Sequence, residues 1–143
     1  MVDKTLILRK LSALDEYLNQ IREYADITVD IYAHDWKVQR IVERTLQMMI
    51  ETCLDISGHI ISDENMRTPE TYADVFRIML ENRVLDDTQL NPFEKMARFR
   101  NIVVHDYEKI DPEIVVGILR NNLQDFEKFK ESIISYLKKS NTH

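Results

Sequence analysis

One stretch near the middle of the chain constrains the fold more than any other, because it is apolar around most of a helical circumference. Between about Trp36 and Ile61, apolar side chains recur every three or four residues. The side chains that interrupt them form one polar strip of Arg40, Arg44, Gln47, Glu51, Asp55 and His59. This pattern predicts a central α-helix that packs against several others.

Amphipathic stretches on both sides of this segment predict four more helices. The first covers about residues 4–25 and is followed by a polar connection over residues 26–35. Thr68-Pro69 and Asn91-Pro92 each place a capping side chain before a proline, which predicts that helices begin there. We expect these helices to reach about residues 80 and 105, the second with a further helical turn before it near Asp87. Asp111-Pro112 opens the last predicted helix, which reaches about Lys138.

The scarcity of turn-forming residues supports the same fold class. The 143 residues include only 2 glycines and 3 prolines, fewer than strand-rich folds with many tight turns usually need. No repeat or linker divides the chain. The sequence therefore predicts an all-α, up-and-down bundle of about five helices, in a single domain over residues 1–143.

The charge balance limits how this chain can contact nucleic acid. The formal net charge is −6 at pH 7, whereas proteins that hold nucleic acid over a broad surface carry a basic face. Any RNA contact is therefore expected to be local, or to be completed by a second chain. The sequence has one cysteine, no leader pattern and no apolar run of the roughly 20 residues that span a bilayer. We expect a cytoplasmic protein without membrane contact.

The most informative motif is Arg100-Asn101-Ile102-Val103-Val104-His105-Asp106-Tyr107. On a helical wheel at about 100° per residue, Arg100 falls near the middle of the apolar face, while Asn101 and His105 lie together on its flank. Because an unpaired buried charge is costly, Arg100 should have a carboxylate partner or line a polar cleft. Arg100 and His105, about 140° apart on the wheel, can converge through the length of arginine, fraying of the helix end or a symmetric dimer.

These residue types suit the cleavage of RNA by its own 2′-hydroxyl group. That reaction needs a proton acceptor, a proton donor and positive charge for the phosphate. His105 can serve the first two roles, and Arg100 offers a planar cationic fork for the third. Asn101 can donate to phosphate or hold the imidazole, and no metal ion or cofactor is required. In the alternative without catalysis, His105 caps the end of its helix, where a cation is favoured.

The motif resembles the signature of the HEPN superfamily, and its His-x-Tyr ending resembles that of the HepT-like family. The resemblance extends through residues 42–61, 71–76, 96–99 and 110–111 and covers about Leu6 to Leu137. It implies an all-helical homodimer that acts as a toxin and cleaves RNA as a metal-independent endoribonuclease. Catalysis would fall to Arg100 and His105 of two protomers, facing a shared cleft, with Asn101 assisting.

The resemblance also implies a partner and a covalent modification. HepT-like toxins of type VII HEPN/MNT toxin–antitoxin systems are paired with a minimal nucleotidyltransferase antitoxin of the MntA type. This antitoxin silences the toxin by transferring AMP to the motif tyrosine, which here is Tyr107. A bulky anionic group on Tyr107 would obstruct the cleft and repel RNA phosphate.

Further roles are expected for the polar strip of the central helix. Arg44, Glu51 and Asp55 are candidates to border the cleft or to position Arg100 or His105. The four-residue steps from Glu51 to His59 also have the spacing of a helical metal face, but one helix supplies only one side of a site, so we expect no metal there.

Two rival functions place the same residues in a different system. The first is a non-catalytic helical partner, or substrate-binding subunit, of a nucleotidyltransferase. The second is an antitoxin whose own partner is the toxin. Fold alone does not separate these roles from the enzyme.

Overall fold

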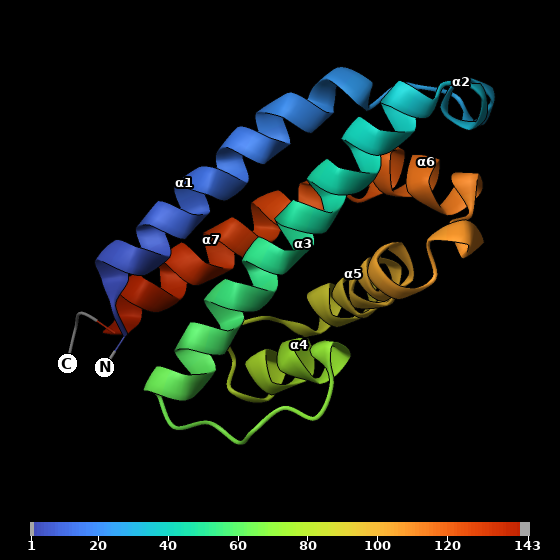
Figure 1. Ribbon diagram of the computed structural model, residues 1–143. Helices are drawn as coiled ribbons and strands as arrows, with labels where there is room; N and C mark the ends of the chain where they lie inside the picture. Colours follow the sequence, from blue (N-terminus) through green and yellow to red (C-terminus); the bar gives the residue numbers. More distant parts are fainter. Residues whose placement is uncertain (1, 141–143) are drawn as a thin grey trace.

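The computed structural model describes residues 2–140, and its regular secondary structure within that range is entirely helical (Figure 1). Residue 1 and residues 141–143 of the predicted domain lie outside the described part. The α-helices are α1 (Lys4–Ile21), α2 (Val29–His34), α3 (Trp36–Asp63), α4 (Tyr72–Glu81), α5 (Asp87–His105), α6 (Pro112–Asn121) and α7 (Leu123–Ser140). Two short 3₁₀ turns join them, η1 (Arg22–Tyr24) and η2 (Tyr107–Lys109). The all-α prediction is confirmed, with seven α-helices over these residues instead of about five.

The long helices α1, α3 and α7 form the body of the molecule, and α4 and α5 pack on the remaining side of α3 (Figure 1). The short helices α2 and α6 lie together near the N-terminal end of α3. Helix α3 contacts α1, α2, α4 and α5, so the central position predicted for it is confirmed. Within residues 2–140, no helix has an apolar stretch long enough to cross a bilayer.

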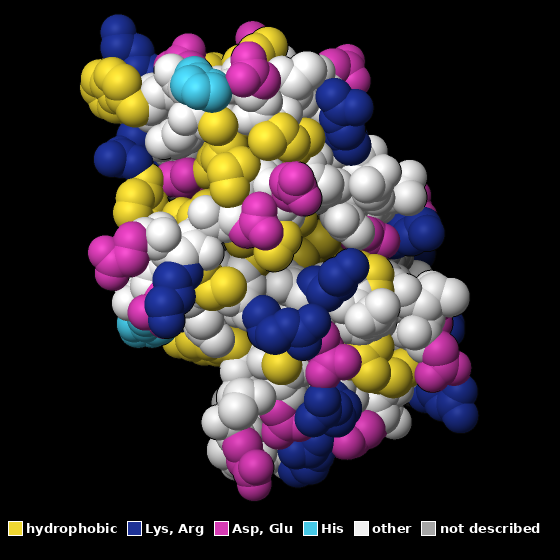
Figure 2. Space-filling view, turned by 90° about the vertical axis from the view of Figure 1, so that its right-hand side faces the viewer, with side chains coloured by type: hydrophobic (Ala, Val, Ile, Leu, Met, Phe, Trp, Pro, Cys, Tyr) yellow, Lys and Arg dark blue, Asp and Glu magenta, His cyan; other side chains and the backbone are white. Residues whose placement is uncertain are grey.

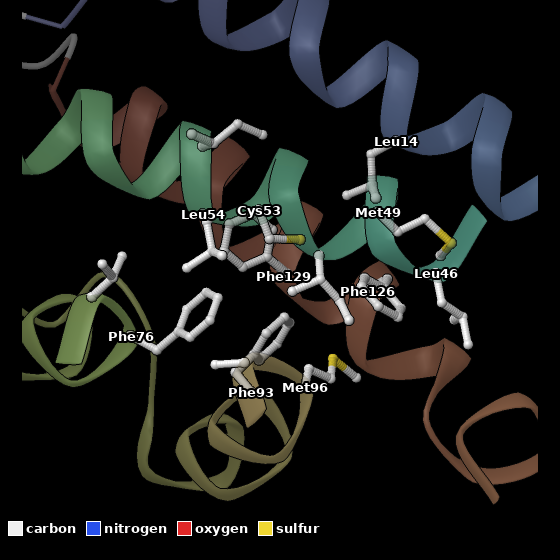
Figure 3. Close-up of a cluster of buried hydrophobic side chains, with 14 of the residues drawn as sticks. Leu14, Leu46, Met49, Cys53, Leu54, Phe76, Phe93, Met96, Phe126 and Phe129 are labelled. Carbon is white, nitrogen blue, oxygen red and sulfur yellow. The ribbon is translucent and has the colours of Figure 1, made fainter. Parts of the chain in front are cut away.

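Aromatic side chains from three helices fill the core beside α3 (Figure 3). The Phe93 ring of α5 lies 4.9 Å from that of Phe76, 5.4 Å from that of Phe129 and 6.0 Å from that of Phe126, measured between ring centres. All four are fully buried, and burying one such side chain stabilises a fold by about 1.5–3 kcal/mol. This packing fixes α5, and with it the motif at its C-terminal end.

Helix α5 begins one turn earlier than predicted. Asn91-Pro92 lies inside the helix because Asp86 caps it first: the Thr88 N–H donates to the Asp86 side chain, and the Asp86 N–H donates to the Gln89 side chain. Pro92, the sixth residue of α5, has no N–H to donate to the carbonyl of Thr88, so one hydrogen bond of the helix is missing there.

Helix α4 begins later than the Thr68-Pro69 pair predicted. Its N-cap is Thr71, whose hydroxyl accepts from the Asp74 N–H. The Asp74 carboxylate accepts from the Glu70 N–H and from Arg67, and these bonds hold the preceding loop outside the helix.

Two further boundaries differ from the prediction. The connection at residues 26–35 contains the short helix α2, which Thr28 caps and which buries the ring of Tyr32. The last predicted helix is two helices, α6 and α7, which meet at Asn122. The Asn122 side chain donates to Asp125 and so favours a new helix start over continuation.

Candidate active site

Three helices hold the guanidinium of Arg100, whose side chain is only 14% exposed. Its Nε donates to Oε1 of Glu51 on α3 at 3.1 Å, and its Nη1 donates to Oδ1 of Asn101 at 3.2 Å. Its Cζ lies 4.6 Å from the centre of the Tyr72 ring on α4, a cation–π contact. The expected carboxylate partner of Arg100 is therefore Glu51. Within residues 2–140 no partner is found for Nη2, which leaves that nitrogen for an anionic ligand.

His105 is the last residue of α5, and its side chain is exposed. Within the described residues its imidazole makes no hydrogen bond or ion pair. His105 and Asn101, one turn earlier, line a pocket of about 550 Å³ between the end of α5 and the start of α4. An exposed and unpaired imidazole can accept a proton from a bound substrate or donate one to it.

The motif gathers its side chains at one end of α5 without joining all of them. Asn101 bonds to Arg100 and lines the pocket beside His105, whereas Arg100 does not line that pocket. No hydrogen bond joins Arg100 to His105 within one chain, so neither the length of arginine nor fraying of the helix end links the two side chains there. One chain therefore presents the cation and the imidazole on neighbouring surfaces, with Asn101 between them.

Tyr107 lies in η2, directly after α5, and its oxygen is tethered although 42% of the residue is exposed. Its hydroxyl donates to Oε1 of Glu43 on α3 at 2.6 Å. Arg40, one turn earlier on α3, donates to the same hydroxyl and places its Cζ 5.0 Å from the centre of the Tyr107 ring. The tyrosine is thus accessible from solvent while its hydroxyl group is already oriented.

Glu43 is a functional candidate that the sequence analysis missed. It is 4% exposed, and its second oxygen accepts a hydrogen bond from the buried Tyr32 of α2. Burial raises the pKa of Glu43, although the Tyr32 hydrogen bond and nearby Arg40 oppose this. Burial, reinforced by Glu43, also raises the pKa of Tyr32. The available signal was a carboxylate within the apolar run of a central helix, which calls for a buried partner.

The polar strip of α3 divides between two neighbouring helices. Glu51 faces α5 and accepts from Gln47 at 3.0 Å as well as from Arg100. Asp55 instead pairs with Lys10 of α1, so the structure does not bring it to Arg100. The cause is helical geometry, because each four-residue step advances the strip by about 40° around the helix.

Two more strip residues, Arg44 and His59, make no hydrogen bond or ion pair with the motif. Arg44 is exposed, and its side chain has no bonded partner within residues 2–140. His59 lies 3.5 Å from Asp55, beyond Glu51 along α3. Among the described residues, no three His, Cys, Asp or Glu side chains are grouped as metal ligands.

Charge on the surface is mixed. Lys and Arg side chains occur in small groups among Asp and Glu on the face shown in Figure 2, and no continuous basic area covers it. On this face, electrostatic attraction for a polyanion is therefore local.

The fold and the motif together define a HEPN-type helical protein. Residues 14–133 match the family model described as ribonuclease HepT-like. The chain is 30% identical over 129 residues to the mRNA nuclease HepT of Shewanella oneidensis, covering 90% of this chain and 96% of that protein. It is 26% identical over 136 residues to the tRNA nuclease HepT of Aphanizomenon flos-aquae, covering 95% and 92%.

A solved structure gives the same result at the level of the fold. The tri-AMPylated HEPN toxin of Shewanella oneidensis, in complex with MNT antitoxin, matches with a TM-score of 0.83 and 28% identity. The match covers 94% of this chain and 99% of that one. This chain belongs to the ribonuclease HepT-like family.

Proposed function

We propose that this protein is the toxin of a type VII HEPN/MNT toxin–antitoxin pair and acts as a metal-independent endoribonuclease. The observation that carries the proposal is the arrangement at the end of α5, where an exposed, unpaired His105 lies one turn from Asn101, which bonds to Arg100. Membership of the HepT-like family supports it, as do relatives named as mRNA and tRNA nucleases.

In the proposed reaction, the 2′-hydroxyl of RNA attacks the adjacent phosphorus. The O2′–P bond forms and the P–O5′ bond breaks, which leaves a 2′,3′-cyclic phosphate and a 5′-hydroxyl. One group must take the 2′-hydroxyl proton and another must protonate the leaving O5′. His105 is suited to both transfers, and Nη2 of Arg100 stabilises the charge on the phosphate.

The two proton transfers favour a homodimer. At the motif one chain presents a single imidazole, that of His105, whereas acid and base must act on opposite sides of the phosphorus. Two copies related by a twofold axis would bring two such histidines to one cleft. A small cleft between two copies also suits a chain with a net charge of −6.

Control of the toxin falls to Tyr107. We propose that a minimal nucleotidyltransferase of the MntA type transfers AMP to its hydroxyl oxygen. The oxygen bonds to the α-phosphorus of ATP, pyrophosphate leaves, and the phenolic proton is released. The exposed ring gives access, and the AMPylated state of the Shewanella oneidensis toxin supports this reaction. The added phosphate would repel RNA from the cleft.

The experiment uses the purified chain, free of its partner, with single-stranded RNA in EDTA. Wild type should cut, and His105→Ala should lose about 100-fold or more, since acid–base catalysis contributes about 10²–10⁴-fold. His59→Ala, which removes a histidine on α3 away from the motif, should cut normally. Helical circular dichroism should be equal in all three. Continued cutting by His105→Ala would remove His105 from the mechanism, and an inactive wild type would favour the non-catalytic partner of a nucleotidyltransferase.

A further inference from the structure

We propose that the pocket between α4 and α5 binds one unpaired nucleobase of the RNA, stacked on Tyr72, beside the phosphate that is cut. This inference rests on the ribonuclease activity proposed above and adds a site for the base. The first observation is the ring itself: Tyr72 is 44% exposed and lines the pocket of about 550 Å³. Exposed aromatic rings are the usual platforms on which proteins stack unpaired RNA bases.

The lining of the pocket suits a flat, neutral group with polar edges. Val75 and Ile102 contribute apolar surface, while Asn101 and Thr71 contribute groups that can bond to the edge of a base. Bases offer both donors and acceptors at that edge, so a pocket with apolar walls and a few polar groups fits them.

The charges around the pocket exclude phosphate from it. Glu70 and Asp106 line it, and no Lys or Arg does so among the described residues. Two carboxylates repel a phosphate and accept hydrogen bonds from the exocyclic amino groups of bases. The base therefore enters the pocket, and the phosphate stays outside.

The pocket is continuous with the proposed cutting site. Its lining includes His105, and the Tyr72 ring that lines it also contacts the guanidinium of Arg100. A nucleotide whose base stacks on Tyr72 thus keeps its phosphate at the edge where the imidazole and the cation lie. The position of Tyr72 is fixed before RNA binds, because Thr71 caps α4 and Arg67 bonds the preceding loop to Asp74.

The test uses a short RNA in which every nucleotide but one is 2′-deoxy, so that only one bond can be cut. The base on each side of that bond is removed in turn to give abasic substrates. Stacking on an aromatic side chain is worth about 1–3 kcal/mol per base, which corresponds to roughly 5- to 150-fold. Wild type and Tyr72→Phe should lose this factor when the stacked base is absent.

The Tyr72→Ala variant distinguishes two roles of this ring: stacking on the RNA base, or only holding the Arg100 side chain in place. We expect this variant to cut intact RNA at least as slowly as wild type cuts the abasic RNA, because the contact with Arg100 is lost as well, and to show no further loss when the base is removed. If Tyr72 served only to hold Arg100, the abasic penalty would persist in Tyr72→Ala at full size, and the proposal would be overturned.

Binding separates this inference from the ribonuclease proposal. The affinity of the chain for a fully 2′-O-methyl version of the RNA, which cannot be cut, is measured by fluorescence anisotropy with and without the same base. Base-dependent binding that disappears in Tyr72→Ala would support the pocket even if the chain cut no RNA. Equal affinity of wild type for intact and abasic oligonucleotides would overturn the pocket even if cutting occurred.

Discussion

At the scale of single residues, Glu43 is a carboxylate whose position and ionisation are both set by its surroundings in the fold. Its carboxylate is buried and accepts hydrogen bonds from the hydroxyl groups of Tyr32 and Tyr107. Tyr107 is partly exposed to solvent, whereas Tyr32 is buried on α2. By bonding to both, Glu43 connects the proposed modification site to α2. The two hydrogen bonds orient this carboxylate, but burial disfavours its charged form.

The first prediction concerns Glu43→Gln, which keeps the side-chain shape and removes the charge. Because the pKa of Glu43 is raised in the folded chain, the unfolded chain ionises first as the pH rises. The stabilising contribution of wild-type Glu43 is therefore complete below its ordinary pKa of 4.5 and declines as the pH rises through the raised value. Urea unfolding from pH 4 to 8 should show wild type losing stability relative to Glu43→Gln. A constant difference across this range would contradict the assignment.

Arg100 and Glu43 show what sequence reasoning can reach at this scale. The wheel placed Arg100 on the apolar face, which required either a carboxylate partner or a polar cleft, because directions within one helix follow from residue spacing. It did not find Glu43, because the tyrosines that meet this carboxylate lie on α2 and η2. Their positions depend on how separate elements pack, which spacing does not specify.

Among the elements, α4 and the loop before it determine where Tyr72 lies. Arg67 donates twice to Asp74, at 2.8 Å each, and twice to Glu81, at 2.9 Å each. The two hydrogen bonds that Asp74 accepts from Arg67, with the one from the Glu70 N–H, lower the pKa of Asp74 to about 2. The loop is thereby fixed along α4, whose first residue contacts Arg100.

The second prediction follows from that lowered pKa. The stabilising contribution of ionised Asp74 is complete above its ordinary pKa of 3.8 and is lost as the pH falls towards about 2. Asp74→Asn should unfold at lower urea concentration than wild type at pH 6, and the difference should shrink as the pH falls from 3.8 towards 2. Glu16→Gln, which changes an exposed carboxylate on α1, should follow wild type throughout. If the difference in stability between Asp74→Asn and wild type were unchanged at pH 2, it would not come from the ionised Asp74 carboxylate.

The start of α5 shows why element boundaries were harder to predict than element types. Asp86 with Gln89 and Asn91 with Pro92 are both acceptable helix starts. The earlier one is used, and its Gln89 is 2% exposed and bonds to Ser132 of α7 at 3.0 Å. That contact lies 43 residues away along the chain, so no local signal favours one cap over the other.

For the whole molecule, the fold class followed from helical periodicity and scarce glycine, but the geometry of the proposed two-chain cleft did not. One chain carries one imidazole at the motif, and no hydrogen bond joins Arg100 to His105. A cleft between two copies requires that one surface patch fits the same patch on the second copy. The hydrophobic periodicity of a sequence does not reveal whether such a patch exists.

The third prediction tests the shared cleft. Wild-type and His105→Ala protomers with different tags are co-expressed, and the mixed dimer is purified. If both histidines act on one phosphate, the mixed dimer should lose about 100-fold or more in cutting rate. A mixed dimer that keeps the activity of one intact site would show that the two protomers act independently.

The chemistry of the cut ends tests the central claim most directly. A labelled RNA is cut in EDTA by the wild-type chain, and the fragments are identified by mass spectrometry. Attack by the 2′-hydroxyl predicts a 2′,3′-cyclic phosphate on one fragment, a 5′-hydroxyl on the other, and no cutting where the attacking nucleotide is 2′-deoxy. Fragments with a free 3′-hydroxyl, or cutting at the 2′-deoxy position, would contradict the catalysis proposed for Arg100 and His105.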